Sequence, residues 1–115
     1  MKIKTSELTG AALDWAVATC EGYDTAFTSA GDVIIFREDV TDYFDPHRNW
    51  GWGGPIIERE RISIRQWTNV PIVHAYMPHD DAPWASDGTS PLVAGMRCYC
   101  SSKLGDEVDV PEELM

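Results

Sequence analysis

The sequence of 115 residues has few cysteines, few basic residues and no long apolar run. Its three cysteines, Cys20, Cys98 and Cys100, form an odd and sparse set that favours free thiols in a reducing cytosol over a disulfide framework. No segment approaches the roughly 18 apolar residues of a membrane span. Residues 1–7 also lack the apolar stretch of a signal peptide. We therefore expect one compact cytoplasmic domain over residues 1–115 without a membrane anchor, and assembly into a homo-oligomer stays open.

Basic residues are scarce, because nine Lys and Arg stand against nineteen Asp and Glu and give a formal net charge of -10. Such a surface repels phosphates at long range, so direct binding of duplex DNA is not expected. An acidic protein that mimics DNA and occupies a basic partner stays open as an alternative. The apolar fraction of 43% argues against a disordered chain.

The chain also lacks the residue patterns of familiar catalytic and metal sites. No Ser or Cys stands at a diagnostic spacing from His47 or His74, and His74 in an apolar run is expected to be structural. The segment His79-Asp80-Asp81 offers only adjacent metal ligands, whereas a metal needs three or four that converge. Cys98 and Cys100 point about 200° apart on a helix, so they cannot share a zinc ion. We predict no metal, no cofactor and no catalytic residue, with Cys100 in the core and Cys98 as a partly exposed or interface thiol.

Two segments have the apolar periodicity and the flanking residues of amphipathic helices. The first is predicted over about residues 6–20, with Thr5 or Ser6 as its cap and Gly22 just beyond its end. Its predicted apolar face comprises Leu8, Ala11, Ala12, Trp15, Ala16 and Thr19.

The second helix has the stronger boundary residues. Thr89 or Ser90 caps it, Pro91 takes its first position and Gly105 ends it. Its predicted apolar stripe comprises Leu92, Val93, Met96, Cys100 and Leu104. From the two stripes we expect substantial burial of Trp15, Met96 and Leu104.

Three short runs rich in β-branched and aromatic residues predict strands at residues 33–36, 62–67 and 71–77. In the run from residue 62, side chains alternate between the two faces of the strand. One face has Ile62, Ile64 and Gln66, and the other has Ser63, Arg65 and Trp67. Residues 37–54 and 78–91 are predicted to be loops, and the length of the first indicates either a function or a missed helix or strand. The acidic tail from about residue 106 is expected to be ordered only where Val108, Val110 or Leu114 docks. This order of elements predicts an α+β fold in which two main helices pack on a small, mainly antiparallel sheet.

The stretch HRNWGWGGPIIERERISI, residues 47–64, is the most unusual part of the chain. Trp50 and Trp52 supply rings on which a base can stack, and the neighbouring glycines let a ligand approach the backbone. The stretch matches neither a phosphate-binding loop with its lysine nor the dinucleotide fingerprint. Two interpretations stay open: a binding loop, or a corner in which one tryptophan is core and the other shields a sheet edge.

Three blocks of this sequence resemble the NinX-type proteins of temperate tailed phages: TSELTGAALDWAVA, NWGWGGPIIERERI and TSPLVAGMRCYCSSKLGDEVDVPEEL. The resemblance implies a small phage-encoded accessory protein made in the host cytoplasm, and the family carries no established activity. Family members tend to have a Ser-Thr-Asp-Trp-Ala-Gln-Gly-Gly-Pro-like segment here. This chain keeps Trp50 and the turn of residues 53–55, and it departs at His47, Arg48, Asn49, Gly51 and Trp52. The departures would change what the segment recognises.

These observations predict a non-catalytic binder of a small anionic ligand, nucleotide-like or ADP-ribose-like, that counteracts host defence. Arg97, in the Met-Arg pair of the family, is expected to reach the same pocket as residues 48–54. The predicted ligand-binding residues are Arg48, Asn49, Trp50, Trp52, Gly53, Gly54, Arg59 and Arg97. An acidic inhibitor that docks on a basic host or defence protein is the alternative. A hydrolase using Asp80 or Asp81 is a third hypothesis.

Overall fold

The computed structural model describes residues 1–77 and 84–114. Its helices and strands, in chain order, are β1 (Lys2–Lys4), a 3-10 turn η1 (Thr5–Glu7), α1 (Gly10–Glu21), β2 (Asp24–Phe27), β3 (Val33–Arg37), β4 (Val40–Tyr43), α2 (Trp50–Arg59), β5 (Ser63–Gln66), β6 (Val73–Met77), β7 (Trp84–Gly88), α3 (Pro91–Leu104), β8 (Glu107–Asp109) and a 3-10 turn η2 (Glu112–Leu114). The predicted α+β class is confirmed. In the described residues a third helix joins the two predicted ones, and the strands divide among three small antiparallel sheets.

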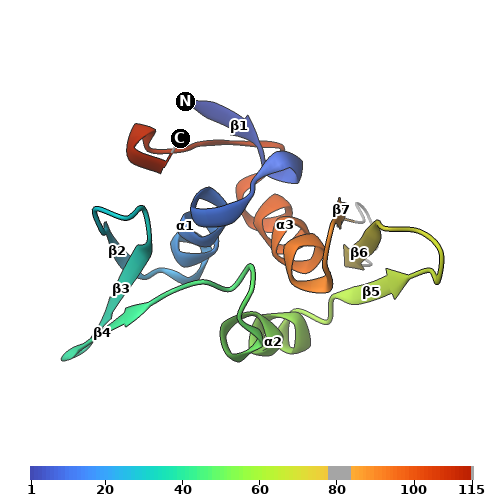
Figure 1. Cartoon of the computed structure of the whole chain (residues 1–115), viewed down its shortest axis with the longest axis horizontal. Coiled ribbons are helices and arrows are strands. Elements are labelled where there is room, and N and C mark those ends of the chain that lie inside the picture. The colour runs from blue at the N-terminus through green and yellow to red at the C-terminus, as the bar shows by residue number, and fades with distance from the viewer. Residues whose placement is uncertain (78–83, 115) are drawn as a thin grey trace.

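Helix α3 is the centre of the molecule, with α1 on one side, the β5–β6–β7 sheet on the other and α2 near one end (Figure 1). Its boundaries are those predicted: the Ser90 side chain accepts the Val93 N–H at 3.1 Å, Pro91 follows, and Gly105 ends it at φ 84°. Because neighbours surround it, α3 is buried far beyond the predicted stripe. The additional buried residues are Ala94, Gly95, Cys98, Tyr99 and Ser101.

Helix α1 begins later than predicted, at Gly10. Thr5 does not cap it, because its hydroxyl lies 2.8 Å from the Ser101 hydroxyl and donates to the Gly105 carbonyl at 2.8 Å. This anchoring to the end of α3 holds Thr5–Glu7 as a separate 3-10 turn. The buried face is also rotated from the predicted one, since Leu13 and Val17 are fully buried while Thr19 is exposed.

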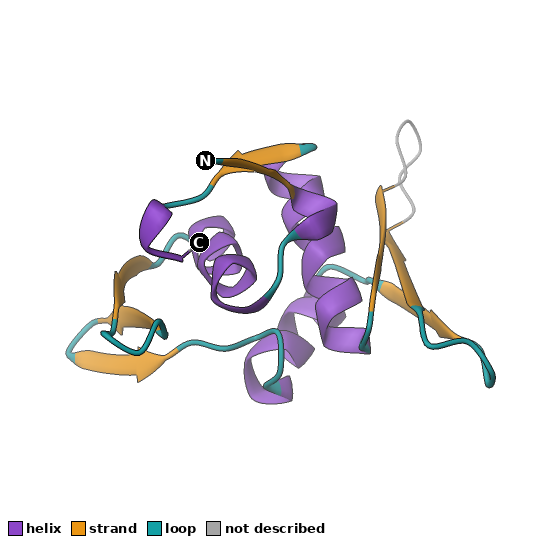
Figure 2. Ribbon diagram, turned by 45° about the horizontal axis from the view of Figure 1, so that its top comes forward, coloured by secondary structure: helices purple, strands orange, loops and turns teal. Residues whose placement is uncertain are grey.

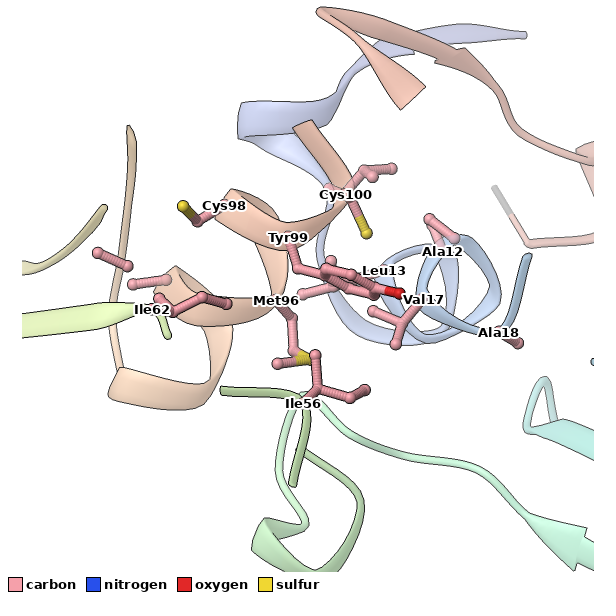
Figure 3. Close-up of a cluster of buried hydrophobic side chains, with 14 of the residues drawn as sticks. Ala12, Leu13, Val17, Ala18, Ile56, Ile62, Met96, Cys98, Tyr99 and Cys100 are labelled. Carbon is pink, nitrogen blue, oxygen red and sulfur yellow. The ribbon is translucent and has the colours of Figure 1, made fainter. Parts of the chain in front are cut away.

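The burial predictions for three large side chains have different outcomes. Met96 is fully buried, as predicted. Trp15 and Leu104 are only partly buried and pack against the edge of the core. Figure 3 shows how α3 directs its side chains in several directions, with Met96 toward Ile56 of α2 and Tyr99 toward α1.

The prediction of a loop over residues 37–54 is wrong in two places, because β4 and the start of α2 lie there. Relative to alanine, each glycine disfavours a helix by about 1 kcal/mol and each proline by about 3 kcal/mol, so the local sequence does not predict α2. Packing supplies the difference: Ile56 is 3% exposed and Ile57 packs on the core from the same helix. Tertiary burial has overridden local propensity.

Residues 33–36 and 71–77 correspond to β3 and β6, and residues 62–67 to β5, with ends that differ by up to two residues. Strand β2 was not predicted, and β7 lies in the predicted loop of residues 78–91, of which residues 78–83 lie outside the described residues. Strands β2–β3–β4 and β5–β6–β7 form two separate sheets at opposite ends of the molecule (Figure 2). In β5–β6–β7, Ile64 pairs with Ala75 and Ala75 with Ser86 on the face against α3.

The acidic tail docks as predicted. Strand β8 pairs antiparallel with β1, where Ile3 lies opposite Val108. Val110 is 1% exposed, and both Val108 and Leu114 pack against the core. In the part of the chain that the structure describes, no helix is long and apolar enough to cross a membrane.

Candidate functional site

Residues 48–54, the stretch predicted to bind a ligand, lie at the first turn of α2. The side chain of Asn49 caps this helix and accepts the Gly51 N–H at 2.8 Å. The carbonyl of Asn49 accepts the N–H groups of Trp52 and Gly53 at 3.1 and 3.0 Å. These three amides are therefore engaged inside the helix, and a phosphate would have to displace those bonds to use them.

The two tryptophans have different surroundings. Trp52 donates its indole N–H to the Tyr43 carbonyl at 3.1 Å and packs edge-on against Phe44, with ring centroids 5.1 Å apart. The guanidinium of Arg37 lies 5.0 Å from the centre of the Trp52 ring. Trp50, by contrast, is 55% exposed. Trp52 therefore joins α2 to the β2–β3–β4 sheet, and Trp50 is the ring that remains accessible.

Gly53 and Gly54 also differ. Gly53 is buried, and a Cβ there would lie 2.5 Å from Leu92 Cδ2 and 2.9 Å from the Pro46 carbonyl oxygen. A side chain at Gly54 would meet only Trp50, at 3.6 Å. Gly53 thus permits close approach of α2 to the start of α3, which is a packing reason for glycine at this position.

Two of the predicted arginines have carboxylate partners. Arg48 donates from Nε to Asp45 at 3.0 Å, and that hydrogen bond raises the pKa of Arg48. Arg59 binds Glu21 through two hydrogen bonds of 3.0 and 2.7 Å and also pairs with Glu60. Hydrogen bonds to Glu21 and Glu60 raise the pKa of Arg59 strongly. Both guanidinium charges are already compensated within the fold.

Arg97 is different, because only backbone carbonyls hold it. Its Nε donates to the Leu8 carbonyl at 2.7 Å and its Nη1 donates to the Asp87 carbonyl at 2.8 Å. No carboxylate of the described residues lies within ion-pair distance of it. Burial lowers the pKa of Arg97, and Glu7 opposes this only through its more distant charge. The guanidinium is thus a cation held in place without a compensating anion.

A cavity of about 540 Å³, here called the Arg97 pocket, lies beside this guanidinium. Its lining includes Ser6, Ile72, His74, Ser86, Asp87, Thr89 and Arg97. His74 is oriented by Asp87, with Nδ1 2.7 Å from the carboxylate oxygen. The hydroxyl oxygen of Ser86 is buried and has no hydrogen-bond partner among the described residues. Such an orphaned hydroxyl costs on the order of 1–3 kcal/mol unless something pairs with it.

A second cavity, of about 500 Å³, lies between α1 and the segment before α2, and we call it the Asp14 pocket. Asp14 is 3% exposed and accepts the His47 backbone N–H at 3.0 Å, and its other oxygen is 2.6 Å from His47 Nδ1. Burial raises the pKa of Asp14 to about 6, against the opposing effect of the bonds to His47. Asp32, Asp45 and Arg48 also line this cavity.

The structure does not bring Arg97 and Arg48 together, contrary to the expectation of one shared pocket. Arg48 lines the Asp14 pocket, and Arg97 lines the other cavity. An anion is disfavoured in the Asp14 pocket because three carboxylates line it, whereas one carboxylate, Asp87, lines the Arg97 pocket and is bonded to His74, and the guanidinium of Arg97 there has no ion-pair partner among the described residues. Of the two cavities, the Arg97 pocket therefore has the electrostatics that suit an anionic ligand.

Sequence reasoning missed the Asp14–His47 pair and the contribution of His74, Ser86 and Thr89. The one local indication for Asp14 is an acidic residue beside Leu13 in an otherwise apolar helix. His47 lies 33 positions away from Asp14, so no spacing pattern connects them. Arg97 was found, but its surroundings come from η1, β6 and β7, which are distant in sequence.

Two further predictions concern metal and thiol chemistry. No group of three or more His, Cys, Asp or Glu side chains in residues 1–77 and 84–114 is placed to hold a metal ion. The segment His79-Asp80-Asp81, and with it the hydrolase hypothesis on Asp80 or Asp81, lies outside the described residues. Cys98 is fully buried rather than partly exposed, because α3 has neighbours on both sides, and burial raises the pKa of its thiol to about 11. Cys100 is buried, as predicted.

Comparison with known proteins gives one family. A family model described as "Bacteriophage P22, NinX" matches residues 4–103, which confirms the resemblance drawn from the three sequence blocks. The matched range contains α1, α2 and nearly all of α3, and it includes both cavities. No curated protein matches the chain.

Proposed function

The chain belongs to the bacteriophage P22 NinX family, which makes it a phage accessory protein, and on that premise we propose that it is a non-catalytic binder of a small anionic ligand of the nucleotide or ADP-ribose class. In this proposal the phage uses the protein to withdraw such a signalling molecule from a host defence system. The link to defence rests on an analogy between small phage proteins. The choice of ligand class rests on the chemistry of the Arg97 pocket.

One observation carries the proposal: the guanidinium of Arg97 is a fixed cation beside a cavity, and this guanidinium has no carboxylate partner among the described residues. Its Nε and Nη1 are bound to backbone carbonyls, so the planar group is oriented before any ligand arrives. Nη2 has no protein partner among the described residues and is free to donate to a phosphate oxygen, in the charge-assisted geometry that arginine forms with phosphates. Preorganisation of this kind reduces the entropy lost on binding.

The remaining lining of the pocket fits the other parts of a nucleotide. The ring of His74 lines the pocket and offers a flat surface for a heterocycle, and it is held by stacking on Tyr76 outside the pocket, with ring centroids 5.9 Å apart and planes at 29°. The hydroxyl of Thr89, which is exposed and lines the pocket, can bond to a ribose or phosphate oxygen. Stacking of a base on an aromatic ring contributes about 1–3 kcal/mol, which is a factor of about 5 to 150 in affinity.

Thermal-shift titration with AMP, ADP-ribose and inorganic phosphate tests this proposal. A ligand at one hundred times its Kd stabilises the folded protein by about 2.7 kcal/mol, which is readily measured. We expect Arg97→Gln to abolish the shift and Arg97→Lys to weaken it, while Arg48→Ala leaves it unchanged. Circular dichroism of each variant separates a lost ligand from a lost fold. Loss of the shift in Arg48→Ala but not in Arg97→Gln would move the site to the start of α2, and no shift with any of the three compounds would overturn the proposal.

The alternative of an acidic protein inhibitor has its own supporting observation. Phe36, Val40, Tyr43 and Trp50, on β3, β4 and the start of α2, are each about half exposed or more. The register places Phe36 and Tyr43 on the same face of the β2–β3–β4 sheet, and exposed aromatic side chains that share a face are typical of protein interfaces. If the protein acts this way, Tyr43→Ala and Trp50→Ala reduce protection of the phage from host defence while the Arg97→Gln variant protects fully. The opposite pattern supports the ligand-binding function.

A further inference from the structure

The β5–β6–β7 sheet has two faces of different character. Helix α3 covers one of them. On the other, here called the outer face, the pairing places Ser63 beside Tyr76 and Tyr76 beside Ala85, and one row further Arg65 beside His74 and His74 beside Asp87. No described element packs on the outer face, and Figure 2 shows this sheet at one end of the molecule with the helices on its other side.

The outer face combines flat rings with a cation. His74 and Tyr76 are stacked neighbours on the central strand, and both are partly exposed. Arg65 lies next to His74 on the edge strand β5, is exposed, and forms no ion pair among the described residues. The carboxylate on this face, Asp87, is already bonded to His74 at 2.7 Å. The neighbours of Tyr76 across the sheet, Ser63 and Ala85, have small side chains.

The outer face is continuous with the Arg97 pocket, because His74, Ala85 and Asp87 belong to both. The two arginines of this region, Arg65 and Arg97, are free of carboxylate partners among the described residues, whereas Arg37, Arg48 and Arg59 are paired. This is a local exception to the net charge of -10. A run of rings flanked by cations is the arrangement by which proteins hold unpaired bases and the phosphates between them.

We propose that the outer face of the β5–β6–β7 sheet is a binding platform for single-stranded nucleic acid, with bases stacked at His74 and Tyr76 and phosphates held by Arg65 and Arg97. This inference rests on the proposed function, since Arg97 holds a phosphate in both, and it extends the ligand from one nucleotide to a short strand. Duplex DNA is a poor ligand for this platform because its bases are stacked on one another and cannot reach the rings.

Fluorescence anisotropy with labelled 12-nucleotide dT and U strands tests the platform, with AMP and a 12-base-pair duplex as comparison ligands. We expect either strand to bind at least tenfold more tightly than AMP and the duplex, and the two strands together test a DNA and an RNA ligand. Tyr76→Ala should weaken binding by about 5- to 150-fold, whereas Tyr76→Phe, which keeps the ring, should bind as the unchanged protein does. Tyr43→Ala removes an exposed tyrosine from the other sheet and is the matched control.

Arg65→Ala gives a second, independent readout. Removing one cation that neutralises a phosphate of a single strand reduces the slope of log affinity against log salt by about 0.7, and Arg65→Ala should show this decrease while its melting temperature stays unchanged. If the strands bind no more tightly than AMP, or if Tyr76→Ala and Arg65→Ala bind normally, the platform is refuted. AMP binding that depends on Arg97 would in that case leave the proposed function standing. Strand binding that depends on Tyr76 and Arg65 but survives Arg97→Gln would instead uphold the platform and refute the role of Arg97.

Discussion

Replacing Gly53 by alanine tests whether packing, rather than access for a ligand, explains the glycines of α2. Alanine in the middle of a helix is favoured over glycine by about 1 kcal/mol, so propensity alone predicts stabilisation. The structure predicts the opposite, because the new Cβ would lie 2.5 Å from Leu92 Cδ2 and 2.9 Å from the Pro46 carbonyl oxygen. The leucine methyl can rotate away, but the carbonyl belongs to the backbone and cannot move without shifting the chain before α2.

Overpacking of this kind costs about 1–3 kcal/mol, so the net effect of Gly53→Ala is a loss of up to about 2 kcal/mol after the gain in propensity. Gly95→Ala is the matched control, since Gly95 is also a buried glycine inside a helix. Its Cβ would lie 3.1 and 3.2 Å from Cδ1 and Cγ1 of Ile57, which are atoms of a flexible side chain. We expect Gly95→Ala to be close to neutral or slightly stabilising.

Urea unfolding followed by circular dichroism measures both variants under identical conditions, with a common slope confirming that the unfolded states are comparable. The expected result is that Gly95→Ala is the more stable variant by about 1–3 kcal/mol. If Gly53→Ala is instead as stable as Gly95→Ala or more so, the close approach of α2 to Leu92 and Pro46 is wrong. The glycine at position 53 would then need a functional explanation, such as contact between a ligand and its backbone.

Three other outcomes follow from the buried polar groups and thiols. Asp14 holds its proton more tightly in the folded state, with a pKa of about 6 against 3.8, so its contribution to stability is present at low pH and is lost as pH rises through about 6. The unfolding free energy of the protein should therefore decrease relative to that of Asp14→Asn by at most about 3 kcal/mol between pH 4 and pH 7. Urea unfolding at both pH values measures this difference, and a difference that does not change with pH would contradict the raised pKa of Asp14. Tyr99→Phe removes a buried hydroxyl that donates to Glu21 at 2.6 Å. Because the acceptor is charged, we expect the free energy of unfolding to decrease by about 1.5–3 kcal/mol. A change below about 0.5 kcal/mol would show that this hydrogen bond is dispensable. Cys98 should react with a thiol reagent only in denaturant, since it is fully buried with a pKa of about 11, and rapid labelling of native protein at Cys98 would show that α3 opens locally.

The tryptophan- and glycine-rich stretch of residues 47–64 combines packing residues with exposed ones. Trp52 and Gly53 are explained by packing, through the bond of Trp52 to Tyr43 and the contact of Gly53 with Leu92. Trp50 remains exposed, and Arg48 lies at the edge of the acidic Asp14 pocket. Among the predicted ligand-binding arginines, the one without a carboxylate partner in the described residues is Arg97, on another helix. Local composition identified an unusual segment, but unusual composition does not separate a ligand contact from a tight packing contact.

Some features of this protein follow from the sequence alone, because they depend on neighbouring residues. The start of α3 at Ser90 and Pro91 and its end at Gly105 come from capping chemistry within one turn. The position of β3 follows from a run of β-branched residues, and the α+β class follows from the order of such segments. The docking of the tail through Val110 was expected from its apolar residues in an acidic stretch.

Other features were decided only by tertiary structure, because they depend on residues that meet from distant parts of the chain. The Thr5 hydroxyl bonds to Ser101, 96 positions away, and this bond moves the start of α1 to Gly10. Helix α2 forms against its own glycine and proline content because its isoleucines are covered by α3. Arg97 donates to the backbone carbonyls of Leu8 and Asp87 and forms no ion pair among the described residues, and this follows from how η1, α3 and β7 meet. Local chemistry determines where a helix can begin and end, whereas burial and charge compensation depend on which neighbours the whole fold brings together.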